Sequence, residues 1–407
     1  MRLGIVVTEF PRITETFVMR DVLAFAEAGH EVRIYRLGPQ RKSEFVHPFA
    51  RPVMSWVRSK PFILDREVVV ALLSQIRADP SGLARIIGRL FRDYVSTPGL
   101  LLKSLAILPK SLAFAQDLKR WGAQHVHAEF AGHPATCAWI AARMTGIPYS
   151  VSCHANDIFR TTNGLAVKLN EAAAIRSISE FNKRFLLERV RGLSAAKIEV
   201  IRCGVDVMTI PRLEAPRWGD VYRILYIGSL EPKKGVDVLL HAVAGARDLE
   251  PWKLDIVGGG PESERLAKLA SNLGLMDRVI FHGPKPFEEV SAAIAAANIV
   301  VAPSIVASGG RMEGIPNTMI EALAHQRPAI STRLSGLPEL IINGETGLLV
   351  TPGNAEELRN ALIWARNHPN ETFAMACRGR RHVEANFDLN ANARAQLQQF
   401  AAHALAS

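Results

Sequence analysis

The sequence predicts an α/β protein made of two doubly wound domains, each with a parallel sheet covered by helices on both faces. The chain has 407 residues, more than one hydrophobic core usually serves. Near-continuous apolar strands alternate with helical segments in both halves, as in parallel sheets buried on both faces. The alternation stops at residues 207–220, where two prolines occur without a regular period, and we interpret this segment as a linker.

The N-terminal half opens as a β-α-β unit and defines a predicted domain over residues 1–206. Its expected elements are a strand at 3–8, a helix at 17–28, a strand at 31–37, a basic helical insert at about 41–120, a strand at 125–128, a helix at 134–144, and strands at 149–153, 172–178 and 197–201. Gly29 is expected to end the first helix.

The C-terminal half repeats the alternation over a predicted domain at residues 221–380. Its expected elements are strands at 222–227, 253–257, 279–282, 299–302, 328–331 and 347–350, with helices at 236–246, 262–273, 287–297 and from Pro316 onwards. From about Ala355 the chain is expected to be helical to its end, with a terminal helix at 381–407. In such sheets ligands bind at the carboxyl ends of the strands, so we expect the two domains to face each other across a ligand-binding cleft.

Composition and charge narrow the possible partners. Hydrophobic residues make up 48% of the chain and charged residues 22%, an ordinary globular balance, with a net charge of +10. Residues 41–120 hold 14 Lys and Arg against 6 Asp and Glu, a net charge of +8. Within them Arg85, Arg89 and Arg92 alternate with apolar residues, which is typical of a basic amphipathic helix. Such a helix either contacts an anionic membrane or packs its apolar side into the fold, and both interpretations stay open. No nucleic-acid-binding module is recognised, so nucleic acid is not an expected partner.

The location predicted from the sequence is the cytoplasm, with possible peripheral contact with the cytoplasmic face of the inner membrane. The first residues are expected to form a strand instead of a signal peptide. The apolar stretch at 100–115 is interrupted by Lys103, Pro109 and Lys110 and is expected to be too short and too charged to span a bilayer. The four cysteines are not spaced as metal ligands, and a disulfide framework is not expected.

The run from Glu313 to Glu321, Glu-Gly-Ile-Pro-Asn-Thr-Met-Ile-Glu, is the most informative motif. Pro316 suits the first turn of a helix, where free backbone amides of residues such as Asn317 and Thr318 would attract phosphate. A carboxylate on either side of these amides could bind sugar hydroxyls. The pattern therefore predicts binding of a diphosphate flanked by two sugars, as in a nucleotide sugar. Two solvated glutamates on a surface helix would give the same sequence pattern.

Two glycine-containing loops follow predicted strands in the same half. One carries Gly228, Ser229 and Lys234, and its lysine could pair with phosphate; the other carries Gly258, Gly259 and Gly260. The second loop invites comparison with the dinucleotide-binding fingerprint. Its third glycine would fall at Ser263, and this departure makes a dehydrogenase a poor interpretation.

Polar residues also follow predicted strands in the first half. His154, with Asn156 and Asp157, comes directly after the strand at 149–153, and His127 and Glu129 end another strand. Each could serve acid–base or sugar-binding chemistry, or could simply be packed at a strand end. The chain contains no Asp-x-Asp motif, so we expect lysine and helix amides to hold a diphosphate without a metal ion, and no cofactor is expected.

Together these segments resemble a retaining glycosyltransferase of family 4 with the GT-B fold, and the resemblance covers nearly the whole chain. In the second half it rests on residues 228–235, 258–261, the Glu313 to Glu321 run, 335–340 and 344–350. In the first half, residues 9–17, 127–132 and 154–159 resemble the subgroup that builds bacterial exopolysaccharide of the colanic-acid type.

The resemblance implies transfer of a hexose from a UDP- or GDP-sugar to a saccharide acceptor that is lipid-linked. It implies that Lys234 binds the diphosphate, Glu313 touches the transferred sugar, Glu321 binds the ribose and His154 lies at the donor sugar. It places the C-terminal helix against the first domain. The full set of implied donor-binding residues is Gly228, Ser229, Lys234, Gly258, Gly259, Gly260, Gly314, Ile315, Pro316, Asn317, Thr318 and Glu321; the acceptor-side candidates are Glu15, Thr16, His127, Glu129, Asn156 and Asp157.

One position departs from the pattern of the family, where many members carry an arginine in place of Ser229. We ask whether Arg311 supplies the second cation instead. Two alternatives also remain at this stage: a nucleotide-sugar 2-epimerase, which shares the architecture, and a non-catalytic sugar-nucleotide-binding protein.

Overall fold

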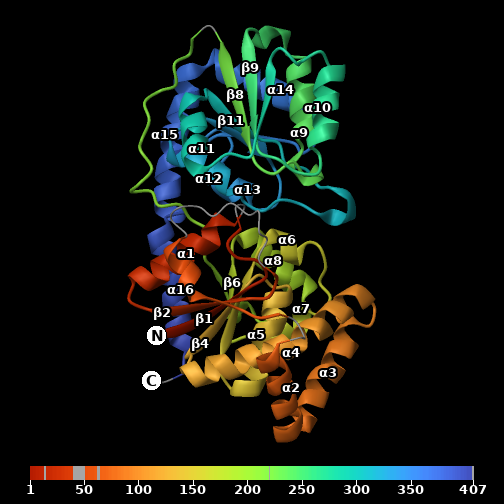
Figure 1. Cartoon of the computed structure of the whole chain (residues 1–407). Helices are drawn as coiled ribbons and strands as arrows, with labels where there is room; N and C mark the ends of the chain where they lie inside the picture. The colour runs from red at the N-terminus through yellow and green to blue at the C-terminus, as the bar shows by residue number, and fades with distance from the viewer. Residues whose placement is uncertain (13–14, 40–50, 62–64, 220, 406–407) are drawn as a thin grey trace. The chain divides into compact units, whose positions relative to one another are not determined.

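The computed structural model describes the chain except for residues 13–14, 40–50, 62–64, 220 and 406–407 (Figure 1). The chain divides into two compact units. Unit 1 contains Met1–Ile201 and Asn392–Ser407, and unit 2 contains Arg202–Ala391. Each unit holds a parallel sheet with helices on both faces, which confirms the predicted fold class.

The sheet of unit 1 has the strand order of a dinucleotide-binding fold. Its described strands run β3-β2-β1-β4-β5-β6-β7, and every pairing is parallel. They are β1 (Arg2–Val7), β2 (Glu31–Arg36), β3 (Val57–Ser59), β4 (His125–Glu129), β5 (Tyr149–Cys153), β6 (Ala174–Ser177) and β7 (Ile198–Val200). In the central strand Leu3 lies between Val32 of β2 and His125 of β4. The chain order reverses beside β1, the point where such folds place their ligands.

Helices cover both faces of this sheet. The helices of unit 1 before the chain enters unit 2 are α1 (Thr16–Glu27), α2 (Arg66–Ala78), α3 (Pro80–Tyr94), α4 (Pro98–Trp121), α5 (His133–Thr145), α6 (Ala155–Ile158), α7 (Leu165–Glu171) and α8 (Glu180–Arg189), with short 3₁₀ turns at Pro52–Trp56 and Ala195–Lys197. Of these, α2 and α3 pack on α4. Val18, Val22 and Phe25 of α1 pack on β1 and β2 because their spacing places them on one side of the helix.

The basic insert differs from its prediction in one respect and decides, for α3, between two alternatives that the sequence left open. It contains β3, which joins the edge of the sheet, as well as helices. In α3 the apolar residues Leu83, Ile86 and Leu90 are buried, so the apolar side of this amphipathic helix packs into the fold. The sequence could not separate this arrangement from a membrane-facing one, since both need the same periodicity.

Helix α4 is continuous through Pro109, where the sequence suggested an interruption. By length and composition alone, α4 is long and apolar enough to cross a membrane. Half of its most apolar 18-residue stretch is buried inside unit 1. Lys110 is buried and donates to the carbonyl of Leu37 at 2.6 Å. Burial lowers the pKa of Lys110 to about 8. The helix therefore packs as a central layer of unit 1, against α5 and α2.

Unit 2 has a second parallel sheet, whose described strands run β10-β9-β8-β11-β12-β13. They are β8 (Tyr222–Ile227), β9 (Trp252–Val257), β10 (Val279–Gly283), β11 (Ile299–Ala302), β12 (Ala329–Thr332) and β13 (Leu348–Val350). The helices are α9 (Val236–Ala244), α10 (Ser263–Asn272), α11 (Phe287–Ala296), α12 (Asn317–Ala324), α13 (Leu337–Leu340), α14 (Ala355–Asn367) and α15 (Pro369–Asn386), with 3₁₀ turns at Pro232–Lys234, Arg247–Leu249 and Ser308–Gly310. Separate apolar clusters fill the two sides of this sheet.

The ends of unit 2 differ from the predicted boundaries. Residues 207–219, predicted as a linker, belong to unit 2. They are held there because Arg380 of α15 donates to the carbonyls of Val207 at 2.6 Å and Ile210 at 3.0 Å. The final helical segment breaks at Phe387: α15 stays in unit 2, whereas α16 (Leu389–His403) belongs to unit 1 from Asn392 onwards. Phe400 of α16 packs edge-on against Phe25 of α1, with ring centroids 5.6 Å apart.

Candidate active site

Two glycine loops at the carboxyl end of the unit 2 sheet lie against each other. Gly228 follows β8 and Gly258 follows β9, and the amide of Leu230 donates to the carbonyl of Gly259 at 2.9 Å. Gly258 has a φ of +141°, and a Cβ there would overlap the carbonyl oxygen of Gly228. Glycine is therefore required at this position because the two loops approach each other too closely for a side chain.

A lysine and a glutamate from the predicted set meet beside these loops. Lys234 ends the 3₁₀ turn after β8, and Glu313 lies in the segment between β11 and α12. The Lys234 Nζ lies 2.6 Å from Glu313 Oε2, and both side chains are mostly shielded from water. Burial raises the pKa of Glu313, but attraction from Lys234 and Lys233 outweighs it and lowers that pKa to about 2. Glu313 is therefore a carboxylate at neutral pH.

The second cation at this carboxylate is Lys233. Its Nζ lies 3.5 Å from Glu313 Oε2, whereas Arg311 is exposed and contacts the carbonyl of Ser308. Ser229 bonds to Glu231 through its hydroxyl at 2.9 Å. Arg311 precedes Glu313 by two residues in the sequence, but the fold brings the lysine pair of the β8 loop to this carboxylate.

Helix α12 begins one residue later than expected, with Pro316 as its N-cap residue and Asn317 as its first helical residue. Gly314 and Ile315 precede the cap. The hydroxyl of Thr318 donates to the carbonyl of Ile227 at 3.2 Å, which fixes the start of α12 to the end of β8. Glu321 is buried one turn inside the helix. The predicted residues of the second half thus gather at one edge of the unit 2 sheet.

In unit 1, His154 follows β5 and stands over a buried carboxylate. Its Nε2 lies 2.7 Å from Glu129 Oε1, and its ring lies between those of Phe17 and Phe130, with centroids 4.9 and 4.8 Å away. Burial raises the pKa of Glu129, but hydrogen bonds with His127 and His154 outweigh it and hold that pKa well below its usual range. Glu129 is therefore ionised and fixes the His154 ring in place.

A buried polar network continues below Glu129 to the C-terminal helix. His127 Nε2 lies 3.1 Å from Glu129 Oε2 and 3.1 Å from the side-chain nitrogen of Gln396 in α16. Arg176 in β6 donates to Gln396 Oε1 at 2.6 Å and to Asp21 Oδ2 at 2.7 Å. These groups are all buried. Because buried polar groups need partners, the network ties α1, β4, β6 and α16 together under His154.

The acceptor-side candidates from the sequence occupy different environments. His127 and Glu129 are 1% and 3% exposed, so both lie inside the fold. The carboxylate of Asp157 accepts from the backbone amide of Ala131, and burial raises its pKa to about 6. Asn156 is exposed.

Glu15 and Thr16 lie at the start of α1, both partly buried. Arg12 donates to Glu15 Oε1 at 2.8 Å. Burial raises the pKa of Glu15 to about 7, because the attraction of Arg12 and His154 offsets only part of the desolvation. Glu15 is thus the candidate whose charge changes near neutral pH.

Sequence reasoning missed Asp21, Arg176 and Gln396, although a signal existed for two of them. Asp21 falls between Val18 and Val22 on the apolar side of α1, and Arg176 interrupts an otherwise apolar strand. A charged residue at a core position of a predicted element calls for a buried partner. Within the described residues, no three His, Cys, Asp or Glu side chains are grouped in a way that could hold a metal ion.

Comparisons with known protein families cover both units. The family described as Glycosyltransferase Family 4 matches residues 14–208, and the family described as Glycosyl transferases group 1 matches residues 214–382. The chain is 26% identical to a protein named as a colanic acid biosynthesis glycosyltransferase, WcaL of Salmonella typhimurium, over 96% of this chain and 97% of the relative. It is 27% identical to the amylovoran biosynthesis glycosyltransferase AmsK of Erwinia amylovora, over 95% and 96%.

The same fold occurs in solved structures. The Anabaena protein HepE, crystallised with UDP, superposes with a TM-score of 0.74 over 98% of this chain and 99% of its own, at 16% sequence identity. The 2-epimerase and non-catalytic alternatives are not favoured by these relatives.

Replacing Gln396 with Ala is expected to destabilise unit 1 by about 2 kcal/mol, because Arg176 and His127 would each lose a buried partner. Gln399→Ala on the same helix is the matched control. Gln399 donates to the exposed Glu199, so its loss should cost less, roughly 1 kcal/mol or below. Hydrogen exchange of α16 and the thermal midpoint measure both. Equal losses for the two variants would contradict the network's role.

Removing the Lys234 ammonium with Lys234→Met is expected to destabilise unit 2 at neutral pH, since Glu313 would remain buried with only Lys233 nearby. The pKa of Glu313 is lower in the folded chain than in the unfolded chain, so its ionisation stabilises the fold at pH values above the unfolded pKa. This contribution is lost as the pH falls towards about 2. The stability gap between wild type and variant should therefore shrink as the pH is lowered from about 5 towards 2. Urea unfolding across this range measures it, and a gap that widens on acidification would refute the assignment.

Proposed function

Since the chain belongs to glycosyltransferase family 4, with relatives named for exopolysaccharide synthesis, we propose that it transfers a hexose from a UDP- or GDP-sugar with retention of configuration. The observation that carries this proposal is the Lys234–Glu313 pair beside the start of α12, with Lys233 as a second cation. A diphosphate needs cations and amide donors, and a sugar needs carboxylates, and both kinds of group gather at this edge of unit 2.

The lysine has capacity for a ligand in addition to Glu313. An ammonium group has three donors, and the pair with Glu313 uses one direction. We propose that Lys234 binds the donor diphosphate, that Glu313 contacts the transferred sugar, and that Glu321 binds the ribose. The glycines at 228 and 258–260, Ser229, and residues 314–318 would line the nucleotide. HepE was crystallised with UDP, which supports a nucleotide-containing donor for this chain.

In this proposal the leaving diphosphate is stabilised by lysine and backbone amides without a metal ion, and no cofactor takes part. Charge stabilisation by fixed donors can supply a large part of the rate enhancement, because these groups need no reorganisation during the reaction. His154 would contact the donor sugar from unit 1, with its ring orientation fixed by Glu129.

The proposed acceptor is a saccharide linked to a lipid, which would place the protein in the cytoplasm with peripheral contact with the inner membrane. The polysaccharide-synthesis names of WcaL and AmsK support a saccharide acceptor. On the side of unit 1, Glu15, Thr16 and Asn156 remain the accessible candidates for acceptor contact.

Lys234→Ala is expected to lower kcat/KM by at least about 100-fold, the usual cost of losing one group that stabilises a leaving anion. A thermal-shift screen of UDP, GDP and their sugars first identifies the donor, and release of the nucleoside diphosphate then reports turnover. Lys253→Ala, an exposed lysine on β9, should leave the rate unchanged. Activity should persist in EDTA. Near-normal turnover by Lys234→Ala, or loss of activity in EDTA that Mg²⁺ or Mn²⁺ restores, would overturn the proposed site or its metal independence, respectively.

Glu129→Gln is expected to lower kcat by about 10- to 100-fold with a smaller change in KM for the donor, because the His154 ring loses its charged partner. Glu171→Gln is the control, since Glu171 is also hydrogen-bonded in unit 1 but stands outside the network. The pH dependence of kcat should change shape in Glu129→Gln and keep it in Glu171→Gln. If both variants lose activity only in proportion to their stability, Glu129 has no positioning role.

A further inference from the structure

Helix α2 exposes an apolar stripe that no other described segment covers. Val69, Val70, Leu73 and Ile76 are 43%, 54%, 46% and 45% exposed. Their spacing places them on one side of the helix, while Val68 and Ala71 on the other side are buried. A single apolar side chain with this exposed fraction is common on protein surfaces. Four of them in one stripe indicate a contact surface.

The stripe is bounded by positive charge. Arg66 stands three and four residues before Val69 and Val70, and Arg77 stands four residues after Leu73, so both arginines flank the same side of the helix. Both are exposed. The acidic residue of this helix, Glu67, is paired with Lys60. Apolar side chains between flanking arginines are the arrangement of helices that lie in a lipid interface, because arginine stems follow the apolar surface while their charges reach headgroups.

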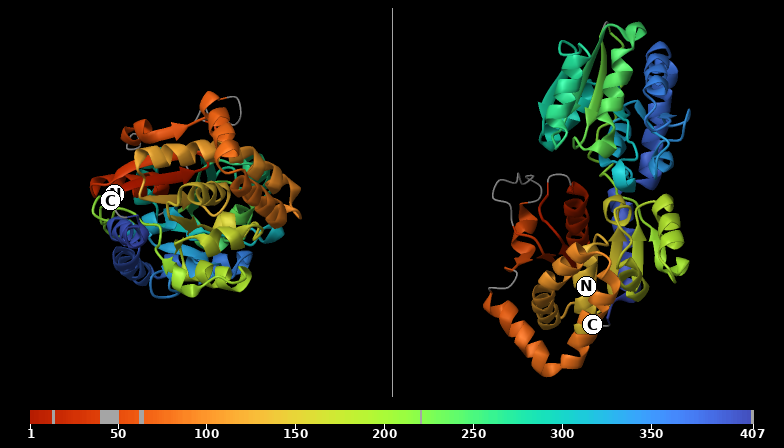
Figure 2. Two further views of the ribbon diagram at one scale, coloured as in Figure 1. Left: turned by 90° about the horizontal axis from the view of Figure 1, so that it is seen from below. Right: turned by 90° about the vertical axis from the view of Figure 1, so that its right-hand side faces the viewer.

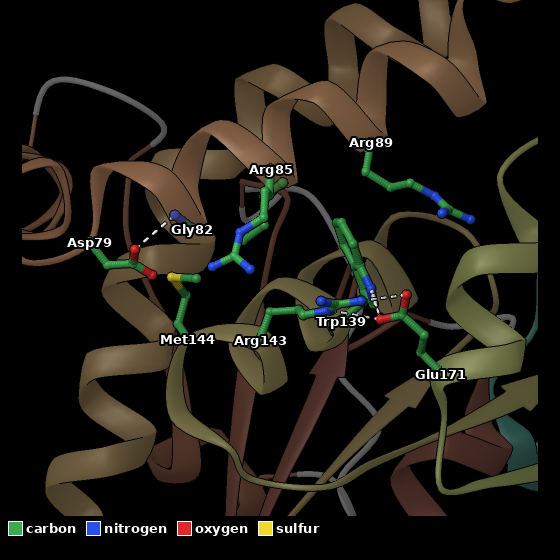
Figure 3. Close-up of a pocket in the computed structure, with 9 residues that line it drawn as sticks. Asp79, Gly82, Arg85, Arg89, Trp139, Arg143, Met144 and Glu171 are labelled. Carbon is green, nitrogen blue, oxygen red and sulfur yellow. Dashed lines mark hydrogen bonds and ion pairs between the residues drawn. The ribbon is translucent and has the colours of Figure 1, made fainter.

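The next helix carries further positive charge. α2 and α3 form a V-shaped hairpin that extends from the rest of unit 1 (Figure 2). One helical turn after Ile76, Asp79 rims a pocket of about 240 Å³. Arg85 and Arg89 point from α3 into this pocket, towards Arg143, Trp139 and Glu171 (Figure 3).

The carboxylates of the pocket are already occupied by the fold. Glu171 pairs with Arg143 at 2.6 Å and accepts from Trp139 Nε1 at 2.7 Å, and Asp79 caps the start of α3. Arg89 pairs with Asp93 at 2.9 Å. Arg85 donates to the carbonyl of Ser81 at 3.4 Å. Hydrogen bonds from the Gly82 amide and Ser81, together with the charge of Arg85, lower the pKa of the nearby Asp79 carboxylate. The pocket thus presents cation to an approaching phosphate.

We propose that the α2–α3 hairpin binds an anionic lipid bilayer, with the α2 stripe entering the interfacial region and the flanking arginines contacting lipid phosphates. Helix α2 is about 20 Å long and lies parallel to such a surface along its whole stripe. This inference goes with the lipid-linked acceptor of the proposed function, but it rests on the exposed surface and not on the donor chemistry. It also assigns membrane contact to α2 instead of the apolar side of α3, which is buried.

The test measures co-sedimentation of the full chain with vesicles of phosphatidylcholine that contain phosphatidylglycerol, compared with phosphatidylcholine alone. Leu73→Glu should lower the partition coefficient at least about tenfold, because it removes apolar contact and adds repulsion. Arg66→Gln and Arg77→Gln should each lower it about fivefold, and Arg85→Gln should do the same, with weaker effects at physiological salt. Met276→Glu changes an apolar residue of unit 2 that is 57% exposed; it is the matched control and should bind like wild type.

Nucleotide-sugar binding is measured by thermal shift on the same proteins. The membrane proposal and the proposed transferase function can then be rejected independently of each other. Wild type that ignores anionic vesicles at low salt but still binds its nucleotide sugar overturns the membrane surface alone. Leu73→Glu that binds vesicles like wild type also overturns it. If this variant instead changes a dimer into a monomer in size-exclusion chromatography while vesicle binding stays intact, the stripe belongs to a contact between copies and the lipid assignment is wrong.

Discussion

A buried carboxylate that is kept ionised by nearby cations is the constraint on which the candidate site depends. Glu313 loses its hydration inside unit 2, and this alone would favour the neutral acid. Lys234 and Lys233 reverse the balance, and they can do so only because the loop after β8 delivers both lysines to the same carboxylate. That delivery requires the tight contact between the two glycine loops, since the Gly258 position has no room for a side chain. Packing of the backbone therefore sets the electrostatics of the site.

Unit 1 also keeps a buried carboxylate ionised, but with different partner groups. Glu129 is also buried and ionised, but its partners are two imidazole rings instead of ammonium groups. An imidazole can change its charge near neutral pH, and an ammonium group in water cannot. Each unit therefore presents a different kind of polar group: fixed positive charge at Glu313 in unit 2, and an oriented imidazole ring in unit 1. In the proposed function the first kind of group suits an anionic leaving group and the second suits a sugar hydroxyl.

The sequence was sufficient for the fold and for much of unit 2, for physical reasons that particular residues illustrate. β8 is a largely apolar run followed by Gly228, and β11 is an apolar run followed by Pro303 and Ser304, so the carboxyl edge and its residues could be predicted together. Contacts between distant segments could not. Gln396 meets His127 across 269 residues of chain, and Lys233 reaches Glu313 through a turn whose direction depends on packing. β3 was also missed, because three residues carry too little periodicity to be told from a loop.

The α2 surface shows why amphipathic periodicity alone does not identify a membrane-binding helix. α3 has the stronger separation of apolar and basic residues, but its apolar residues Leu83, Ile86 and Leu90 are buried within unit 1. α2 looks less amphipathic in sequence, because apolar residues occur on both of its sides: Val68 and Ala71 face the fold, and Val70 and Leu73 face outward. A helix that must bind the protein on one side and lipid on the other needs apolar residues on both. The exposed side is therefore visible only after the buried side has been assigned by the structure.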